Sequence, residues 1–251
     1  MHLILTGATG LVGSSVLDAM IKAKDVSRIS ILSRRPIQMV EDSKDPRIRV
    51  IIHNDFNQYD STILDQLKGA DGCVWALGIS QTKVGKEDYV RITKDYTLAA
   101  AKSFATLSSE ERPFRFIYVS GEGATQNPGR FSPIFARVKG ETEQALADLS
   151  ASTPSLKADS VRPAYVDASS HEAIRPYIPD PGLLYKAGAT ALSGLIRAGL
   201  SGHHSPTPML GAFLTELAAG KLDGKLPTSG AFEIGKSWVV PNVALRKMMG
   251  L

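Results

Sequence analysis

The N-terminal stretch from Met1 to Gly13 constrains the fold more than any other part of the chain. An apolar run stops at Thr6, and glycines follow at Gly7, Gly10 and Gly13 before a helix-compatible segment. A strand, a glycine turn and a helix in this order are the context of a dinucleotide-binding turn. Gly7 allows the sharp turn, Gly10 lets a pyrophosphate approach, and Gly13 lets the helix pack closely. The predicted cradle also includes Thr6, Thr9, Leu11 and Val12.

Size and composition favour one α/β domain. The chain has 251 residues, of which 43% are hydrophobic, and this is enough for one full core. We expect a dinucleotide-binding core over 1–166 and a small C-terminal cap over 167–251. No apolar run reaches the length of about 18 residues that a membrane helix needs, and no signal peptide precedes the glycines, so we expect a cytoplasmic protein without a membrane partner. The net charge of +4 is spread out, which argues against nucleic acid as a partner.

Strand-like and helix-like segments alternate through the first two thirds of the chain, which predicts a doubly wound parallel sheet of the Rossmann type. Strands are expected at 3–5, 28–32, 49–52, 72–77, 114–119 and 161–166. Helices are expected at 12–24, 59–68, 87–107 and 132–149, the last with Ser132 as its cap and Pro133 in its first turn. Beyond residue 167 the chain is richer in proline and glycine, with apolar stretches at 182–200 and 208–217 and a final helix at 241–249.

The end of the second expected strand indicates which dinucleotide is bound. This position contacts the adenosine ribose, where an acidic residue binds a free 2′-hydroxyl and an arginine accommodates a 2′-phosphate. Here the chain has Ser33, Arg34 and Arg35 and no Asp or Glu. Guanidinium groups match phosphate oxygens well, so the sequence favours NADP(H) over NAD(H). The alternative is that both arginines are solvated surface charges.

Other residues at strand ends complete the expected cofactor site. Asp55 follows the third strand and is a candidate for contact with adenine, and the small residues of Ala76-Leu77-Gly78 would let the backbone lie along the cofactor. Cys73 is expected in the core. The pair His203-His204 has no third ligand nearby, so we predict no metal site.

These motifs resemble the short-chain dehydrogenase/reductase superfamily in its atypical branch, whose TGATGxxG turn matches residues 6–13. Segments at Gly123-Ala124 and at Val138-Lys139-Gly140-Glu141 are similar to its Tat-interacting-protein type. The resemblance covers residues 1–166 well and the remainder poorly. It implies a Rossmann fold, a nicotinamide cofactor and a small-molecule substrate. Family members often dimerise through helices corresponding to 87–107 and 132–149, so a homodimer is a further hypothesis.

The chain departs from the family at the residues that carry the chemistry. In the family a Tyr-x-x-x-Lys helix provides a proton-transferring tyrosine and a lysine that binds the nicotinamide ribose. Lys139 matches that lysine, whereas Phe135 stands where the tyrosine is expected and cannot transfer a proton. The family serine after the fifth strand aligns with Gly121, and Ser120 lies one residue earlier. An offset of one residue on a strand turns the side chain to the other face.

Three interpretations remain open. The protein is a reductase with another proton donor, for which the candidates are Tyr165, Tyr177, Ser120 or a water held by Lys139. It is a redox-neutral isomerase or cyclase on the same fold, whose pocket orients and polarises the substrate. Or it binds NADP(H) without catalysis, as a sensor or regulator. Fold alone does not choose between these functions. The first interpretation assigns Lys139, Ser120 and Tyr165 to catalysis.

Overall fold

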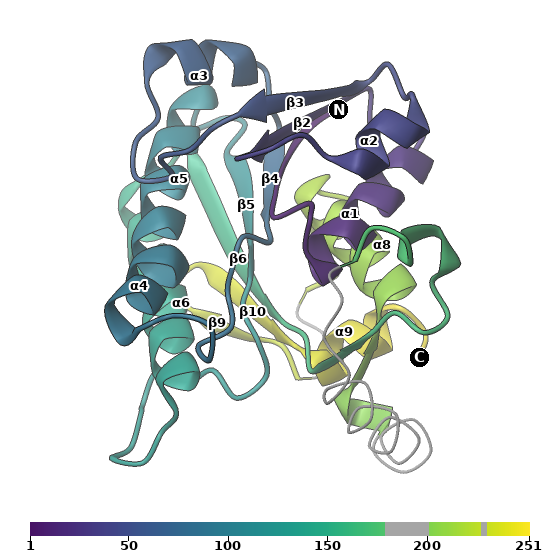
Figure 1. The fold of residues 1–251 in the computed structure, drawn as a ribbon. Helices are drawn as coiled ribbons and strands as arrows, with labels where there is room; N and C mark the ends of the chain where they lie inside the picture. Colours follow the sequence, from purple (N-terminus) through teal and green to yellow (C-terminus); the bar gives the residue numbers. More distant parts are fainter. Residues whose placement is uncertain (179–200, 227–229) are drawn as a thin grey trace.

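The computed structural model describes residues 1–178, 201–226 and 230–251, and its centre is a mostly parallel sheet (Figure 1). The sheet has eight strands in the order β3-β2-β1-β4-β5-β6-β10-β9, and only β9 is antiparallel to its neighbour. Their bounds are β1 His2–Thr6, β2 Arg28–Ser33, β3 Ile48–Ile52, β4 Gly72–Trp75, β5 Phe114–Val119, β6 Leu156–Arg162, β9 Phe232–Ile234 and β10 Ser237–Pro241. The predicted doubly wound Rossmann-like fold is confirmed.

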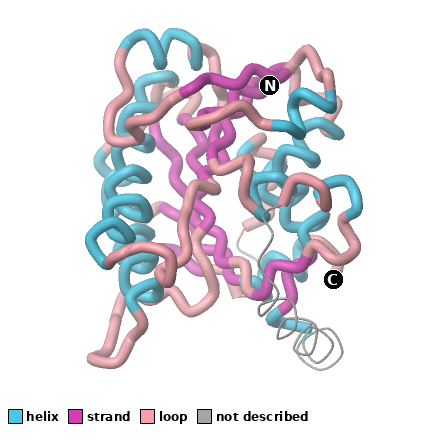
Figure 2. The backbone as a smooth tube through the Cα atoms, in the orientation of Figure 1, coloured by secondary structure: helices cyan, strands magenta, loops and turns pink. Residues whose placement is uncertain are grey.

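Helices cover both faces of the sheet, and the strands run between the two helical layers (Figure 2). One layer contains α1 (Leu11–Lys22), α2 (Gln38–Ser43), α8 (Thr207–Ala218) and α9 (Asn242–Met248). The other contains α3 (Ser61–Leu67), α5 (Tyr96–Phe104) and α6 (Ile134–Ser152). Because parallel strands buried on both faces need apolar side chains on both, β1 and β4 are buried at every position. Cys73 is buried in the apolar core between the sheet and the layer of α3, α5 and α6, as predicted.

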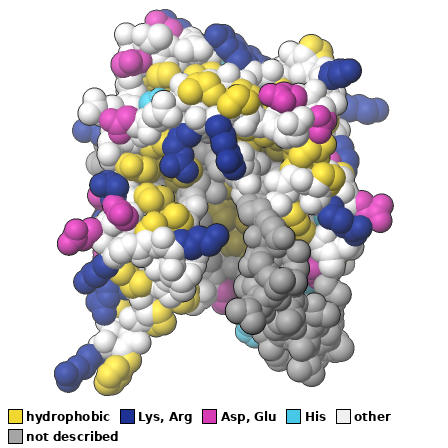
Figure 3. Space-filling view, in the orientation of Figure 1, with side chains coloured by type: hydrophobic (Ala, Val, Ile, Leu, Met, Phe, Trp, Pro, Cys, Tyr) yellow, Lys and Arg dark blue, Asp and Glu magenta, His cyan; other side chains and the backbone are white. Residues whose placement is uncertain are grey.

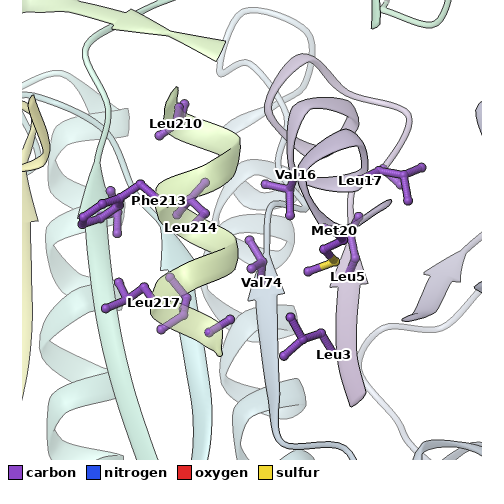
Figure 4. Close-up of a cluster of buried hydrophobic side chains, with 14 of the residues drawn as sticks. Leu3, Leu5, Val16, Leu17, Met20, Val74, Leu210, Phe213, Leu214 and Leu217 are labelled. Carbon is purple, nitrogen blue, oxygen red and sulfur yellow. The ribbon is translucent and has the colours of Figure 1, made fainter. Parts of the chain in front are cut away.

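The first layer depends on close packing between α1 and α8. Figure 4 shows side chains of both helices gathered over β1 and β4, among them Val16, Met20, Leu210 and Leu214. The backbones approach so closely that a Cβ at Gly211 would lie 2.2 Å from the carbonyl oxygen of Ser15. Helix α8 confirms the helix expected over 208–217, although it belongs to the core and not to a peripheral cap.

The long helix predicted over 87–107 is interrupted. It consists of α4 (Lys86–Val90), a π-helical turn (Arg91–Asp95), α5 and a final 3₁₀ turn (Ala105–Leu107). The π-helical turn adds a residue to one turn of the helix and moves the buried face, so Thr97 is fully buried and Leu98 only half-buried. Such turns are frequent at functional sites.

Two other predicted boundaries were wrong. The sixth strand is residues 156–162 and not 161–166, because Pro163 has no N–H to donate to a sheet. Residues 165–167 instead form β7 (Tyr165–Asp167), which pairs with β8 (His204–Pro206) in a separate two-stranded sheet. Helix α6 begins at Ile134, and its cap is Pro133 rather than Ser132, because the ψ angle of Pro133 is extended at 149°.

The C-terminal third contributes to the sheet. Strand β10 pairs in parallel with β6, and β9 adds an antiparallel edge to it. The final helix was predicted nearly correctly, although Pro241 ends β10 and caps the helix instead of lying in its first turn. The stretch at 182–200, together with Pro179 and Pro181, lies outside the described residues. Among the described residues, no helix is long and apolar enough to cross a membrane.

Candidate nucleotide-binding and active site

The glycine turn between β1 and α1 has the geometry that the spacing predicts. Gly7 has a φ of +71°, and a Cβ there would lie 2.3 Å from the carbonyl oxygen of Ala76. A Cβ at Gly13 would lie 2.0 Å from the carbonyl oxygen of Gly7, so α1 can approach the turn only with glycine at this position. Gly10 caps α1 without a side-chain hydrogen bond. The helix therefore presents its first N–H groups and its positive dipole end to the cavity described next.

A cavity of about 740 Å³ lies at the carboxyl ends of the central strands, where open α/β sheets bind ligands. A hollow runs down the middle of this face, with Lys and Arg side chains near its upper end (Figure 3). The cavity is lined by Gly10, Leu11, Val12, Ala76, Leu77, Gly78, Ile79, Ser80, Thr93, Tyr118, Val119, Ser120, Gly121, Glu122, Lys139, Pro163, Ala164, Tyr165, Val166 and His203. It therefore joins the glycine turn to Lys139 in one space.

A second cavity, of about 410 Å³, lies at the ends of β1 and β2. It is lined by Gly7, Ala8, Thr9, Ser33, Arg34, Arg35, Phe56 and Leu77. Leu77 borders this cavity and the first one, which places the two cavities next to each other. The hydroxyl of Ser33 donates to the carbonyl of Arg35 at 2.8 Å and fixes the turn that presents both exposed arginines. The structure thus brings the two predicted arginines to the glycine turn.

Three of the predicted cofactor residues, Thr6, Gly13 and Asp55, line neither cavity. Gly13 serves the close packing of α1 described above. Asp55 is exposed, and its carboxylate accepts from the N–H of Asn57 at 3.0 Å, so it caps a local turn. Thr6 is fully buried, and its hydroxyl accepts from the N–H of Leu77 at 3.2 Å. Thr6 therefore holds the end of β4 against β1 and shapes the cavity from behind.

Lys139 enters the main cavity from α6. Its side chain is half-buried, its ammonium donates to the carbonyl oxygen of Ser120, and burial lowers its pKa to about 8. A Cβ at Gly121 would lie 3.4 Å from the Lys139 Nζ atom. The position that aligns with the family serine is therefore the one beside the lysine, and in this chain it carries no side chain.

Ser120 occupies the cavity edge but directs its hydroxyl elsewhere. The Oγ atom donates to Oε1 of Glu143 at 2.5 Å, and both residues are almost completely buried. Arg162 donates to the two carboxylate oxygens of Glu143 at 2.9 and 2.5 Å, and Gln126 adds a bond of 2.5 Å. A buried carboxylate needs such partners because its desolvation is costly. This network engages Ser120, which weakens the prediction that its hydroxyl transfers a proton.

Phe135 stands one helical turn before Lys139 and is not among the residues that line the cavity. Its ring lies 3.6 Å from the place that a Cβ of Gly123 would occupy, and its backbone N–H donates to the Gln81 side chain at 2.9 Å. The residue in the tyrosine position is therefore packed against the loop after β5.

The two candidate tyrosines lie in different places. Tyr165, on β7, lines the main cavity together with Lys139. Tyr177 lines a separate cavity of about 370 Å³ beside Arg35, and its hydroxyl donates to Asp42 at 2.8 Å. Tyr177 therefore lies beside α2 and not in the cavity that Lys139 enters. Only Tyr165 of the two remains a candidate.

Sequence reasoning missed several residues of the site. Thr93, Glu122 and His203 line the main cavity, and Thr93 lies within the π-helical turn, which the sequence analysis did not predict. Gly140 has a different role, because a Cβ there would lie 1.9 Å from the carbonyl oxygen of Thr125. The loop after β5 can therefore reach α6 only at a glycine. The signal for this contact in the sequence is the glycine that directly follows Lys139.

Histidines near the cavity take part in local bonds. His204 lies 2.9 Å from the Asp167 carboxylate across the β7–β8 pair, and the buried His53 packs against Phe56 and Tyr59. In the part of the chain that the structure describes, there is no group of three or more His, Cys, Asp or Glu side chains that could hold a metal ion.

Solved structures of similar fold include several reductases and a dTDP-glucose 4,6-dehydratase from Streptomyces venezuelae. A short-chain dehydrogenase/reductase from Serratia marcescens has a TM-score of 0.66 at 14% identity, and the match covers 97% of each chain. The PhqB reductase domain from Penicillium fellutanum has a TM-score of 0.63 at 16% identity, over 96% of this chain and 66% of that one. These likenesses show that the fold is a Rossmann-like α/β fold. No family model matches the sequence.

Several named proteins share more of the sequence with this chain than these solved structures do. Botcinic acid biosynthesis cluster B protein 16 of Botryotinia fuckeliana is 44% identical over 61% of this chain and 98% of its own length. Leucinostatins biosynthesis cluster protein T of Purpureocillium lilacinum is 35% identical over 71% of this chain and 70% of its own. Protein HTATIP2 of Rattus norvegicus is 25% identical over 58% of this chain and 56% of its own. The chain belongs to the short-chain dehydrogenase/reductase superfamily, in its atypical branch.

Proposed function

We propose that this protein is an NADP(H)-dependent oxidoreductase that reduces the carbonyl group of a small substrate and takes the proton from Lys139. The observation that carries the proposal is the single cavity that joins the start of α1 to Lys139. Two relatives are named for the botcinic acid and leucinostatin biosynthesis clusters, which supports a reaction in biosynthesis.

The residues present fit an NADP(H) molecule. Around a Cβ built at Gly10, the only atom within 4 Å among the described residues is the carbonyl oxygen of Gly7, so the space beside this glycine is open. The N–H groups at the start of α1 would bind the pyrophosphate. Arg34 and Arg35 would bind the 2′-phosphate from the neighbouring cavity. When bound, NADPH supplies the hydride.

Lys139 is suited to provide the proton that a carbonyl oxygen gains when it becomes an alcohol oxygen. An acid works best when its pKa lies near the working pH, and burial lowers the pKa of Lys139 to about 8. The hydrogen bond to the Ser120 carbonyl directs the ammonium to the cavity edge beside Gly121. Because Gly121 has no side chain, the substrate oxygen can approach the ammonium there. Tyr165 is the alternative donor in the same cavity.

A regulator that binds NADP(H) without turnover is the second candidate. The observation that favours it is the absence of both family hydroxyl groups, since Phe135 and Gly121 stand where the family has a tyrosine and a serine. Under this alternative Lys139 only holds the nicotinamide ribose, and NADPH binds without being consumed.

The experiment that separates the candidates measures NADPH consumption with a panel of aldehydes and ketones. We expect turnover with at least one of them and a loss of about 100-fold or more in kcat for Lys139→Met, because removal of a general acid costs that much. Lys102→Met is the matched control, since Lys102 is an exposed lysine on α5. Tight NADPH binding without turnover across the panel would contradict the reductase and support the regulator. A Lys139→Met variant as active as Lys102→Met would instead exclude Lys139 as donor.

A further inference from the structure

Asn242, the first residue of α9, connects segments that are far apart in the sequence. It is 1% exposed and does not line the main cavity. Its Nδ2 atom donates to the carbonyl oxygens of Gly202 and His204 at 2.6 and 3.3 Å, and its Oδ1 atom accepts from the hydroxyl of Ser205 at 2.7 Å. Its backbone N–H donates to the carboxylate of Glu122 at 3.4 Å.

Each of these bonds leads to a segment that lines the cavity. The Ser205 hydroxyl also accepts from the N–H of Ala164 at 2.9 Å, so the amide of Asn242 reaches segment 163–166 through one intermediate atom. His203 lies between the two carbonyls that the Nδ2 atom holds, and Glu122 follows β5. Glu122, segment 163–166 and His203 together line one side of the cavity, which we name the substrate wall.

We propose that Asn242 is a positioning residue that fixes the substrate wall. The name of this wall rests on the proposed function, which assigns the glycine turn and the ends of β1, β2 and β4 to the nucleotide. All of the hydrogen bonds described for the Asn242 amide go to segment 202–205, which contains His203 and reaches Ala164 through the Ser205 hydroxyl. Removal of the amide would leave the Gly202 carbonyl and the hydroxyl proton of Ser205 without this partner, and buried polar groups are costly in that state. The His204 carbonyl would keep its bond from Arg246 at 2.8 Å. The wall would then move, and the nucleotide side would remain in place.

Hydrogen–deuterium exchange tests the proposal without any substrate. For Asn242→Ala we expect exchange to accelerate about ten-fold or more in peptides over 163–167 and 201–206, and to stay as in wild type over 7–13. Ser205→Ala removes the bridge between Ala164 and Asn242 and leaves the bonds of Asn242 to Gly202 and His204, so acceleration is expected over 163–167 even if Asn242→Ala fails to fold. Val243→Ala is the matched control, because Val243 is the exposed neighbour on α9. Unchanged exchange in the wall segments, or equal acceleration over 7–13, would overturn the proposal.

Enzyme kinetics distinguish a positioning role from a merely stabilising one, because a residue that only stabilises the fold would not change KM selectively. With a substrate from the carbonyl panel, we expect KM to rise about ten-fold for Asn242→Ala, while the Kd of NADPH stays within about two-fold. Equal rises in KM and in the Kd of NADPH would contradict a role confined to the wall. If wild type reduces no substrate, the reductase proposal fails, and the exchange measurement still decides whether Asn242 fixes the wall.

Discussion

Lys139 is the residue on which the proposed chemistry depends, and its protonation gives a test by pH. Burial lowers its pKa to about 8, so the ammonium that donates the proton is present below that pH and lost above it. We expect kcat for carbonyl reduction to be level below about pH 8 and to fall about ten-fold per pH unit above it. A kcat that stays level to about pH 10 would therefore contradict Lys139 as the donor.

Asp159 is a buried carboxyl on β6, outside the active site. Burial raises its pKa to about 6, although it accepts from the N–H of Trp238 at 2.8 Å. Because the folded pKa lies above the unfolded value, the contribution of Asp159 to stability is full below about pH 4 and is lost as the pH rises through about 6. Asp159→Asn keeps an oxygen acceptor and removes the charge.

The variant Asp159→Asn should therefore be more stable than wild type by on the order of 1–3 kcal/mol at about pH 7.5 and about equal at pH 4. Thermal or urea unfolding at both pH values measures the difference. Asp148→Asn, on the exposed side of α6, is the control and should show no such pH dependence. A stabilisation of equal size at both pH values would show that the charge of Asp159 is not its cause.

Residue identities predicted the unusual features of the site, but not the directions of its side chains. The spacing identified Phe135 and Gly121 as departures from the family pattern and Lys139 as a match to it. The structure adds that Ser120 turns its hydroxyl toward Glu143, a residue 23 positions later in the chain. That direction depends on a contact between β5 and α6, which no local pattern in the sequence encodes.

At the scale of elements, the contact between α1 and α8 gives the clearest prediction. Because a Cβ at Gly211 would lie 2.2 Å from a backbone oxygen of α1, Gly211→Ala must push the two helices apart. We expect a loss of about 1–3 kcal/mol in the free energy of unfolding, despite the better helix propensity of alanine. Urea unfolding measures the loss, with Gly129→Ala as the control in an exposed loop that has room for a Cβ. Equal stability of Gly211→Ala and wild type would contradict this packing.

Elements with continuous apolar runs were predictable, and those with mixed composition were not. Strands β4 and β5 lie nearly where their apolar residues indicate. Strand β6 begins earlier than predicted, because it carries Lys157, Asp159 and Ser160, and their polarity hides a strand within the sheet. Strand β10 was missed because it is short and follows a glycine-rich segment. Its partner strand β6 also lies far away in the sequence, since Val239 pairs with Ser160, 79 residues earlier.

At the scale of the whole molecule, the sequence predicted the sheet and the edge at which ligands bind. The parallel direction of the strands follows from alternating strands and helices, and the carboxyl edge is where the glycine turn, the arginines and Lys139 meet. The contribution of the C-terminal segment to the core could not be predicted, because it depends on contacts between distant parts of the chain. A homodimer through 87–107 and 132–149 remains a prediction, which a measurement of the molecular mass in solution tests.

The central claim is that the two cavities at the carboxyl edge hold a dinucleotide with a 2′-phosphate. The most direct measurement is calorimetric titration of wild type, of an Arg34→Ala/Arg35→Ala variant and of the control Arg49→Ala with NADPH and NADH. Arg49 is an exposed arginine on β3, outside the cavities described here. We predict that wild type and the control bind NADPH about ten-fold or more tightly than NADH, and that the double variant loses this preference. Equal affinity of wild type for NADPH and NADH would contradict the claim.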